Sequence, residues 1–150
     1  MIFLLVPALV FALDFLVKSH VEKTRKLGEE ERKLGGRVII RRMSNYGTAG
    51  SKLKKRPKLV CAMHGISMLV MTGAYIRLLM ENGRTGLKLA VGLAIGGGAS
   101  NLYDRIRKGY VTDYVSFRVP IKKIRKLVFN ISDFMIMAGC ILGILFGMEE

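Results

Sequence analysis

The stretch GGGASNLYDRIRKGYVTDYVSF (Gly96–Phe117) changes from glycine-rich apolar sequence to polar sequence and then to a strand-like pattern. Three polar residues, Asn101, Asp104 and Arg105, follow the glycines. Asp104 and Arg105 lie three and four residues after Asn101, so the three side chains share one face of a helix. Asp113 lies in a segment where aromatic and β-branched residues alternate with polar ones, which is typical of a β-strand. The stretch therefore predicts a helix whose polar end leads into a short strand.

Four apolar segments organise the rest of the chain. They comprise residues 1–17, 59–80, 87–102 and 127–148. At about 1.5 Å per residue, the first segment gives about 26 Å of helix, which is barely enough for a bilayer core. Glycines four residues apart in the third and fourth segments allow helices to approach closely. We therefore predict a mainly α-helical membrane protein, a single domain over residues 1–150 with four transmembrane helices.

The composition also favours a membrane protein with basic loops. Of 150 residues, 51% are apolar, and 25 Lys and Arg against 11 Asp and Glu give a net charge of +14. Because a soluble domain rarely combines such a charge with a positive mean hydropathy, apolar and charged residues must be segregated. Residues 18–58 carry fourteen Lys and Arg, and residues 103–126 carry eight.

Two parts of these basic segments have strand-like sequences. They are RVIIRRMSNYG (residues 37–47) and GYVTDYVSFRV (residues 109–119). The mixed-charge stretch KTRKLGEEERK (residues 23–33) is instead expected to form a solvated helix end or a loop. Two short strands on one side of a membrane can pair, so we expect a small β-platform at the membrane surface.

Polar residues also interrupt the first and last apolar segments. Asp14 lies within the first, although a carboxylate inside a membrane span is costly and normally has a specific role. Asn130 and Asp133, in FNISDF, are three residues apart and share a helix face. If the helices alternate in direction, these side chains gather at the same end of the bundle as those of the glycine-rich stretch.

Three interpretations fit this polar cluster. It can be a structural network in which Arg105 neutralises an aspartate, a path for ions or protons, or a pair of catalytic carboxylates. Two carboxylates held close together cannot both ionise easily, so they share one proton. The ionised one can then accept a proton from water while the protonated one polarises a peptide carbonyl.

Other catalytic chemistry is not expected from this sequence. Neither a Ser nor a Cys nucleophile is suitably placed, and no group of His, Cys and carboxylate residues has the spacing of metal ligands. We therefore expect neither a metal nor another cofactor.

The ordered motifs resemble those of the lipoprotein signal peptidases, also called signal peptidase II. That family has Asn-x-x-Asp-Arg, then Val-x-Asp-Phe, then Phe-Asn-x-Ala-Asp. The corresponding segments here are NLYDR (residues 101–105), VTDY (residues 111–114) and FNISD (residues 129–133). The two departures, Tyr114 for Phe and Ser132 for Ala, are mild.

Two further motifs extend the resemblance to nearly the whole chain. Asp14 and Lys18 resemble the family's Asp-x-x-x-Lys motif at the end of the first helix. NYGTAGS (residues 45–51) resembles its Asn-x-Gly-Ala-Ala-Phe-Ser motif, with Gly50 where an aromatic residue is usual.

The resemblance implies an intramembrane aspartic endopeptidase. By motif position, Asp113 and Asp133 would be the catalytic dyad. Other polar residues would shape the site, hold the substrate backbone or support the dyad: Asn101, Asp104, Arg105, Asn130, Asn45 and Asp14.

The resemblance also implies a substrate and a location. The substrate would be a prolipoprotein whose lipobox cysteine carries a diacylglyceryl group, and cleavage just before that cysteine would release the signal peptide. The enzyme would be a monomeric multi-pass protein of the bacterial cytoplasmic (inner) membrane, and the family topology has the termini in the cytoplasm and the long loops outside. The positive-inside rule predicts the opposite orientation, because the two long loops hold 22 of the 25 Lys and Arg, so the orientation stays open. If the long loops are outside, they have a different use. There, the basic loops could bind anionic lipid head groups beside the substrate.

Two alternatives remain open. A divergent relative could use the same dyad to cut other membrane peptides. A non-enzymatic membrane adaptor or insertion factor could instead use its basic loops to contact RNA, the ribosome or anionic lipid. The loops lack the regular aromatic residues on which single-stranded nucleic acid stacks, so a nucleic-acid partner is not expected.

Overall fold

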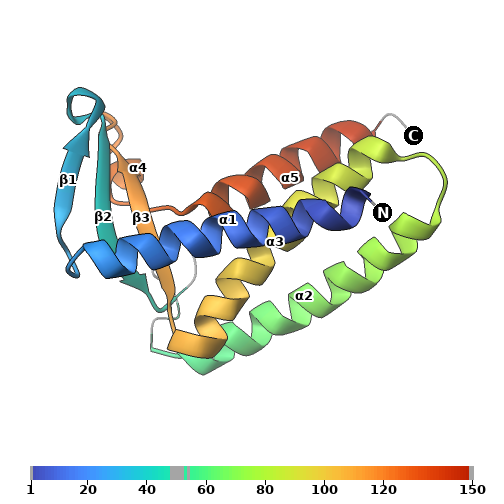
Figure 1. Ribbon diagram of the computed structural model, residues 1–150, viewed down its shortest axis with the longest axis horizontal. Coiled ribbons are helices and arrows are strands. Elements are labelled where there is room, and N and C mark those ends of the chain that lie inside the picture. Colours follow the sequence, from blue (N-terminus) through green and yellow to red (C-terminus); the bar gives the residue numbers. More distant parts are fainter. Residues whose placement is uncertain (1, 48–52, 54, 149–150) are drawn as a thin grey trace.

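Helices and a small terminal sheet make up the protein in the computed structural model, which describes residues 2–47, 53 and 55–148. The four long helices are α1 (Ile2–Thr24), α2 (Pro57–Met80), α3 (Thr85–Lys108) and α5 (Ile131–Gly147). The strands are β1 (Glu30–Lys33), β2 (Val38–Asn45) and β3 (Val111–Phe117), and two short helical turns are η1 (Leu34–Gly36) and α4 (Lys122–Arg125). The sheet covers one end of the helical bundle (Figure 1).

The helix ends differ from the limits of the apolar segments. The first helix continues beyond residue 17 to Thr24, and the third beyond residue 102 to Lys108. The fourth begins at Ile131 rather than at residue 127, because Asn130 has an extended backbone and caps the helix. Apolarity predicts which residues can lie in lipid, whereas polar contacts and caps determine where a helix stops.

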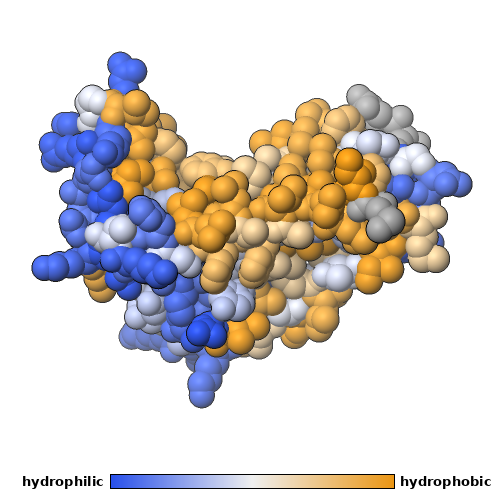
Figure 2. Space-filling view, viewed as in Figure 1, coloured by the Kyte–Doolittle hydropathy of each residue, from blue (hydrophilic) through white to orange (hydrophobic). Residues whose placement is uncertain are grey.

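Two helices, α1 and α2, are long and apolar enough to cross a membrane. Helix α5 is apolar but has 17 residues, and α3 carries several glycines and a polar end. Hydrophobic surface covers the bundle, and hydrophilic surface gathers over the sheet end (Figure 2). The structure is therefore mainly helical, with two clear apolar spans and a small sheet.

Helix α3 is central and packs against α1, α2 and α5. A Cβ added at Gly96 would lie 2.7 Å from the carbonyl oxygen of Pro7 in α1. A Cβ added at Gly97 would lie 2.6 Å from the carbonyl oxygen of Ser132 in α5. Because neither position has room for a methyl group, these two glycines allow the helix backbones to approach closely. Of the glycines spaced four apart in the sequence, Gly96 and Gly139 lie at such close contacts, whereas Gly143 has its nearest contact at 4.0 Å and Gly147 has none within 4 Å.

The sheet has the order β1-β2-β3, and both pairs of neighbours are antiparallel. β2 and β3 confirm the two predicted strands. β1 corrects the expectation of a solvated helix end or loop: its Glu30 pairs with Arg41 at 2.9 Å, and its Glu31 pairs with Arg25 and Lys33. Charge pairing thus accompanies a strand that lacks the usual apolar alternation.

A β-bulge in β2 decides which face of the sheet Asn45 occupies. Ile40 pairs with Val115, whereas Met43 pairs with Asp113, so β2 has one extra residue between these pairs. Because successive strand residues face opposite sides, one extra residue reverses the facing of all that follow. The bulge therefore places Asn45 on the same face of the sheet as Asp113.

Polar contacts attach the sheet to the ends of the helices. Arg42 donates hydrogen bonds to the carbonyl oxygens of Glu22, at 2.9 Å, and Arg25, at 3.1 Å, where α1 ends. Nζ of Lys108, at the end of α3, donates to the hydroxyl of Thr112 in β3 at 3.1 Å and pairs with the carboxylate of Glu22 in α1 at 2.5 Å. These contacts hold the platform in a defined position on the bundle.

We predict that Gly139→Ala in α5 lowers the thermal stability of the purified protein in detergent. A Cβ at position 139 would lie 2.6 Å from the carbonyl oxygen of Ala90, so the helices must separate, at a cost of about 1–3 kcal/mol. Gly143→Ala is the matched control, because its nearest contact is 4.0 Å, from the Cβ of Ala90. Equal melting temperatures for the two variants would contradict this account of the packing.

Candidate functional site

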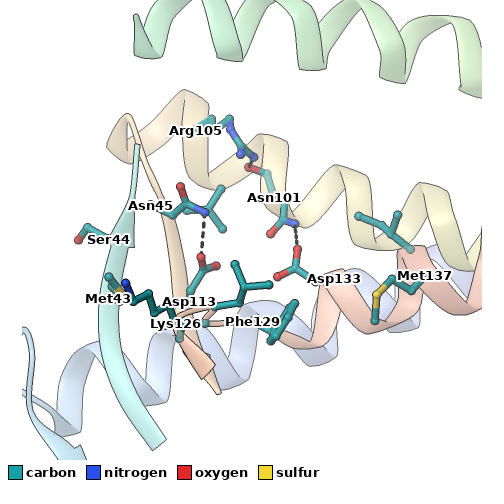
Figure 3. A pocket seen from close by; sticks show the side chains of 14 residues that line it. Met43, Ser44, Asn45, Asn101, Arg105, Asp113, Lys126, Phe129, Asp133 and Met137 are labelled. Carbon is teal, nitrogen blue, oxygen red and sulfur yellow. Dashed lines mark hydrogen bonds between the residues drawn. The ribbon is translucent and has the colours of Figure 1, made fainter. Parts of the chain in front are cut away.

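A cavity of ≈ 340 Å³ lies between the sheet and the ends of α3 and α5 (Figure 3). Five of the polar residues singled out from the sequence line it: Asn45, Asn101, Arg105, Asp113 and Asp133. Its apolar lining includes Met43 and Val111 from the strands, Val128 and Phe129 before α5, and Ile136 and Met137 within α5. The cavity therefore has a polar part next to an apolar part.

Asp113 projects from β3 into the polar part of the cavity and is 4% exposed. Its Oδ2 accepts a hydrogen bond from Nδ2 of Asn45 at 3.0 Å, and its Oδ1 accepts one from Nδ2 of Asn130 at 2.8 Å. Burial and the negative charge of Asp133 raise the pKa of Asp113 to about 7, although the two amide hydrogen bonds oppose the rise. A substantial fraction of Asp113 is therefore protonated at neutral pH.

Asp133 lies in the first turn of α5 and belongs to a capping box. Its Oδ2 accepts a hydrogen bond from the backbone N–H of Asn130 at 3.0 Å, while Oδ1 of Asn130 accepts one from the backbone N–H of Asp133 at 2.9 Å. The carboxylate accepts a second hydrogen bond at Oδ1, from Nδ2 of Asn101 at 3.1 Å. Backbone donors and the helix N-terminus both stabilise a negative charge at this position.

Asn130 connects the two aspartates. It is fully buried, donates from Nδ2 to Asp113, and exchanges the capping hydrogen bonds with Asp133. Its Nδ2 also donates to Oδ1 of Asn101 at 3.2 Å. One residue therefore holds carboxyl groups that come from a strand and from a helix, through its side-chain amide at Asp113 and its backbone N–H at Asp133.

Lys18 fixes the orientation of the Asn101 amide. Nζ of Lys18 donates to Oδ1 of Asn101 at 2.7 Å, so Nδ2 of that amide is left to donate to Asp133. The same ammonium group pairs with Asp14 at 2.6 Å and with Asp104 at 3.4 Å. Lys18 thus pairs with both buried aspartates behind the cavity, and Lys108 also pairs with Asp104, at 2.7 Å.

Asp14 and Asp104 support the site from behind without lining the cavity. The Asp14 carboxylate accepts hydrogen bonds from the hydroxyls of Ser100 and Ser132, both at 2.6 Å. Asp104 accepts a hydrogen bond from the backbone N–H of Thr112 at 3.1 Å, next to Asp113 in the chain. Asp14 thus connects α1 to α3 and α5, and Asp104 connects α3 to β3.

Arg105 connects the helices to the segment that follows β2. Its Nη2 donates to the carbonyl oxygen of Gly47 at 3.2 Å, and its Nη1 donates to that of Asn101 at 3.3 Å. His64 of α2 also contacts it, with Nδ1 at 3.3 Å from Nη1. The remaining positions of the NYGTAGS motif that the resemblance used, Ala49 and Ser51, lie outside the described residues.

All eight residues singled out from the sequence belong to one connected region, but some participants were not expected as site residues. Lys18 was assigned to a motif without a role, Ser132 was treated only as a mild departure from the family's Ala, and Ser100 was not considered. The spacing of Asp14 and Lys18, four residues apart on one helix face, was the available signal. Among the described residues, no group of three or more His, Cys, Asp and Glu side chains is placed to hold a metal ion.

Comparison with known proteins identifies the family. A family model described as Signal peptidase (SPase) II matches residues 6–148. The chain belongs to the signal peptidase II family. It is therefore an aspartic endopeptidase, and the non-enzymatic adaptor considered from the basic loops is not favoured.

Relatives with the name lipoprotein signal peptidase and a solved structure with the same fold match nearly the whole chain. Lipoprotein signal peptidase of Halothermothrix orenii is 33% identical over 95% of this chain and 92% of its own length. That of Moorella thermoacetica is 30% identical over 93% of this chain and 88% of its own. A solved bacterial membrane enzyme, 21% identical, has a TM-score of 0.84 over 98% of this chain and 87% of its own, which shows the same fold.

We predict that Lys18→Met strongly destabilises the protein. Removing the ammonium group leaves the buried Asp14 without a cationic partner, which costs about 3–5 kcal/mol, and it frees the Asn101 amide to rotate, whereas Asp104 keeps its pair with Lys108. The measurement is the unfolding midpoint in detergent. Lys23→Met on the exposed end of the same helix is the control, and an equally small loss in both variants would show that the buried network is not needed.

Proposed function

We propose that Asp113 and Asp133 are the dyad with which this chain removes signal peptides from prolipoproteins. Removal of signal peptides is the function of the family to which the chain belongs. The residue assignment is supported above all by one observation: both carboxyl groups line one cavity and are held by hydrogen bonds to the same buried Asn130.

The surroundings of the two carboxyl groups support different roles. Asp133 accepts a backbone N–H and lies at the positive end of the α5 dipole, so it carries the negative charge and acts as general base. Asp113 is buried on a strand, and its raised pKa keeps it protonated, so it acts as general acid. This assignment gives the site one shared negative charge.

Hydrolysis in this site needs neither a metal nor a covalent intermediate. Asp133 takes a proton from a water molecule as the water oxygen bonds to the carbon of the scissile carbonyl. The proton of Asp113 moves to the carbonyl oxygen, which gives a neutral tetrahedral intermediate. When the C–N bond breaks, the proton on Asp133 passes to the leaving nitrogen and Asp113 recovers its proton from the new hydroxyl group.

The apolar part of the cavity supports a substrate with lipid attached. Met43, Phe129 and Met137 line the cavity that also contains the two aspartates, so an apolar group could rest beside a peptide bond at the dyad. A diacylglyceryl group on the cysteine just after the cleaved bond has the required chemistry. We infer that recognition of this group directs cleavage to the bond before that cysteine.

We further propose that all four long helices span the bacterial cytoplasmic (inner) membrane and that the enzyme acts as a monomer. α1 and α2 have the length and apolarity for a span, and α5 is apolar over 17 residues. α3 is enclosed by the other three helices, so its glycines and polar groups face protein rather than lipid. The platform then lies at the membrane surface, with the dyad near the boundary.

We predict that Asp113→Asn and Asp133→Asn each lower cleavage of a diacylglyceryl-modified precursor by about 10² to 10⁴-fold. Asn can neither accept a proton from water nor release one to the carbonyl oxygen. Glu29→Gln, which removes an exposed carboxylate from the platform, is the control and should retain full activity. Wild-type activity in either aspartate variant would refute the dyad. If the wild type cleaved a precursor without the lipid as well as the lipid-modified precursor, the result would favour a divergent relative that acts on other membrane peptides.

We predict that kcat/KM falls as the pH rises through about 7, because the general acid Asp113 then loses its proton. Asn45→Ala should move this fall to higher pH. The Asn45 amide stabilises the ionised form of Asp113, so its removal raises the pKa of that carboxyl group further. A pH profile of each enzyme measures the shift, and a shift to lower pH in Asn45→Ala would reverse the proposed role of Asp113.

A further inference from the structure

We propose that the segment between β3 and α5 is a membrane anchor that binds anionic phospholipid beside the catalytic cavity. We call residues 118–126 the interfacial segment. It contains α4 and is joined to the platform by the N–H of Arg118, which donates to the carbonyl oxygen of Arg37 at 2.8 Å. Neither the proposed hydrolysis nor the polar network behind the cavity uses this segment.

The first support is a local excess of positive charge. Residues 114–132 contain five Lys and Arg and no Asp or Glu. Arg118, Arg125 and Lys126 are exposed. The carboxylates of β1, Glu30 and Glu31, are paired with other cations. The charge of the interfacial segment is therefore directed to solvent or to a ligand.

The second support is the exposure of apolar side chains among these charges. Ile121 is 57% exposed and Ile124 is 39% exposed, and they lie three residues apart at the single turn of α4. This turn lies on the side of the platform that faces α5 (Figure 1). Figure 2 shows a hollow between the platform and α5 with hydrophobic surface on both of its sides. Isoleucines at this position can enter the bilayer next to α5.

The two features together indicate the chemistry of the partner. Cationic side chains bind phosphate, and apolar side chains beside them favour a surface where phosphate lies next to hydrocarbon. An anionic phospholipid such as phosphatidylglycerol presents both. A soluble anion or a nucleic acid would use the cations but would leave the isoleucines exposed to water.

The position of the segment connects lipid binding to the enzyme. Lys126 lines the catalytic cavity and lies shortly before Ile131, where α5 begins. A lipid held by the interfacial segment would therefore occupy the bilayer directly beside the cavity entrance. The effect of the bound lipid on substrate entry rests on the proposed function, whereas the binding of the lipid to the interfacial segment does not.

The first experiment measures binding without activity. The full-length protein in a neutral detergent is titrated with phosphatidylglycerol or with phosphatidylcholine of the same acyl chains, and bound lipid is counted by native mass spectrometry. The wild type should bind phosphatidylglycerol several-fold better than phosphatidylcholine. Arg118→Gln with Arg125→Gln should remove this preference.

A matched control separates a local site from overall charge. Arg77→Gln with Arg84→Gln removes two charges at the opposite end of the bundle, where α2 ends and α3 begins, and should keep the preference. Equal binding of phosphatidylglycerol by the interfacial variant and the wild type would overturn the proposal. Equal losses in both double variants would do so as well, because the effect would then reflect net charge.

Two further arms identify the source of the anion and the effect on catalysis. Glycerol 3-phosphate, which has the headgroup chemistry without acyl chains, should not compete with the lipid, and Ile121→Gln with Ile124→Gln should weaken binding of both lipids. Competition by glycerol 3-phosphate would overturn the lipid assignment.

In vesicles, phosphatidylglycerol should lower the KM of the wild type but not of the arginine variant. Asp133→Asn should bind the lipid normally, so a failed dyad and a failed anchor give different results.

Discussion

The buried polar end of the bundle depends on the contacts of the Lys18 ammonium group. Its ammonium group pairs with Asp14 and Asp104 and donates to Asn101, so charges that would be costly between membrane helices compensate one another. Among the described residues, every buried polar side-chain atom has a hydrogen-bond partner. Removing one member leaves others unpaired, and therefore the network constrains α1, α3 and β3 together.

The same network determines the geometry of the proposed dyad. Lys18 fixes one end of the Asn101 amide, the other end faces Asp133, and Asn130 then connects both to Asp113. Two carboxyl groups from different elements are thereby positioned before substrate arrives. Because no large rearrangement of the protein's dipoles is needed during the reaction, such preorganisation lowers the barrier to hydrolysis. Structural and catalytic interpretations of the polar cluster are therefore compatible, since the network that holds the helices together also positions the proposed dyad.

The sheet end of the molecule combines this polar site with surfaces suited to a membrane boundary. Apolar residues line the cavity next to the aspartates, and the interfacial segment presents cations and isoleucines on the side facing α5. A substrate that is part peptide and part lipid needs both kinds of surface. The high positive charge of the chain is thus concentrated where lipid phosphates, rather than a soluble acidic partner, would lie.

The sequence by itself determined the helices, two of the three strands and the residues of the site. Apolar segments, glycine spacing and the order of the Asn and Asp motifs are local patterns. In the folded protein they correspond to helices, to close contacts between helices and to the polar end of the bundle. Only the tertiary structure decided the pairing of β1, the facing of Asn45 and the partners of Lys18. These depend on a one-residue bulge and on side chains far apart in the chain, such as Lys18 and Asn101, whose meeting no local pattern encodes.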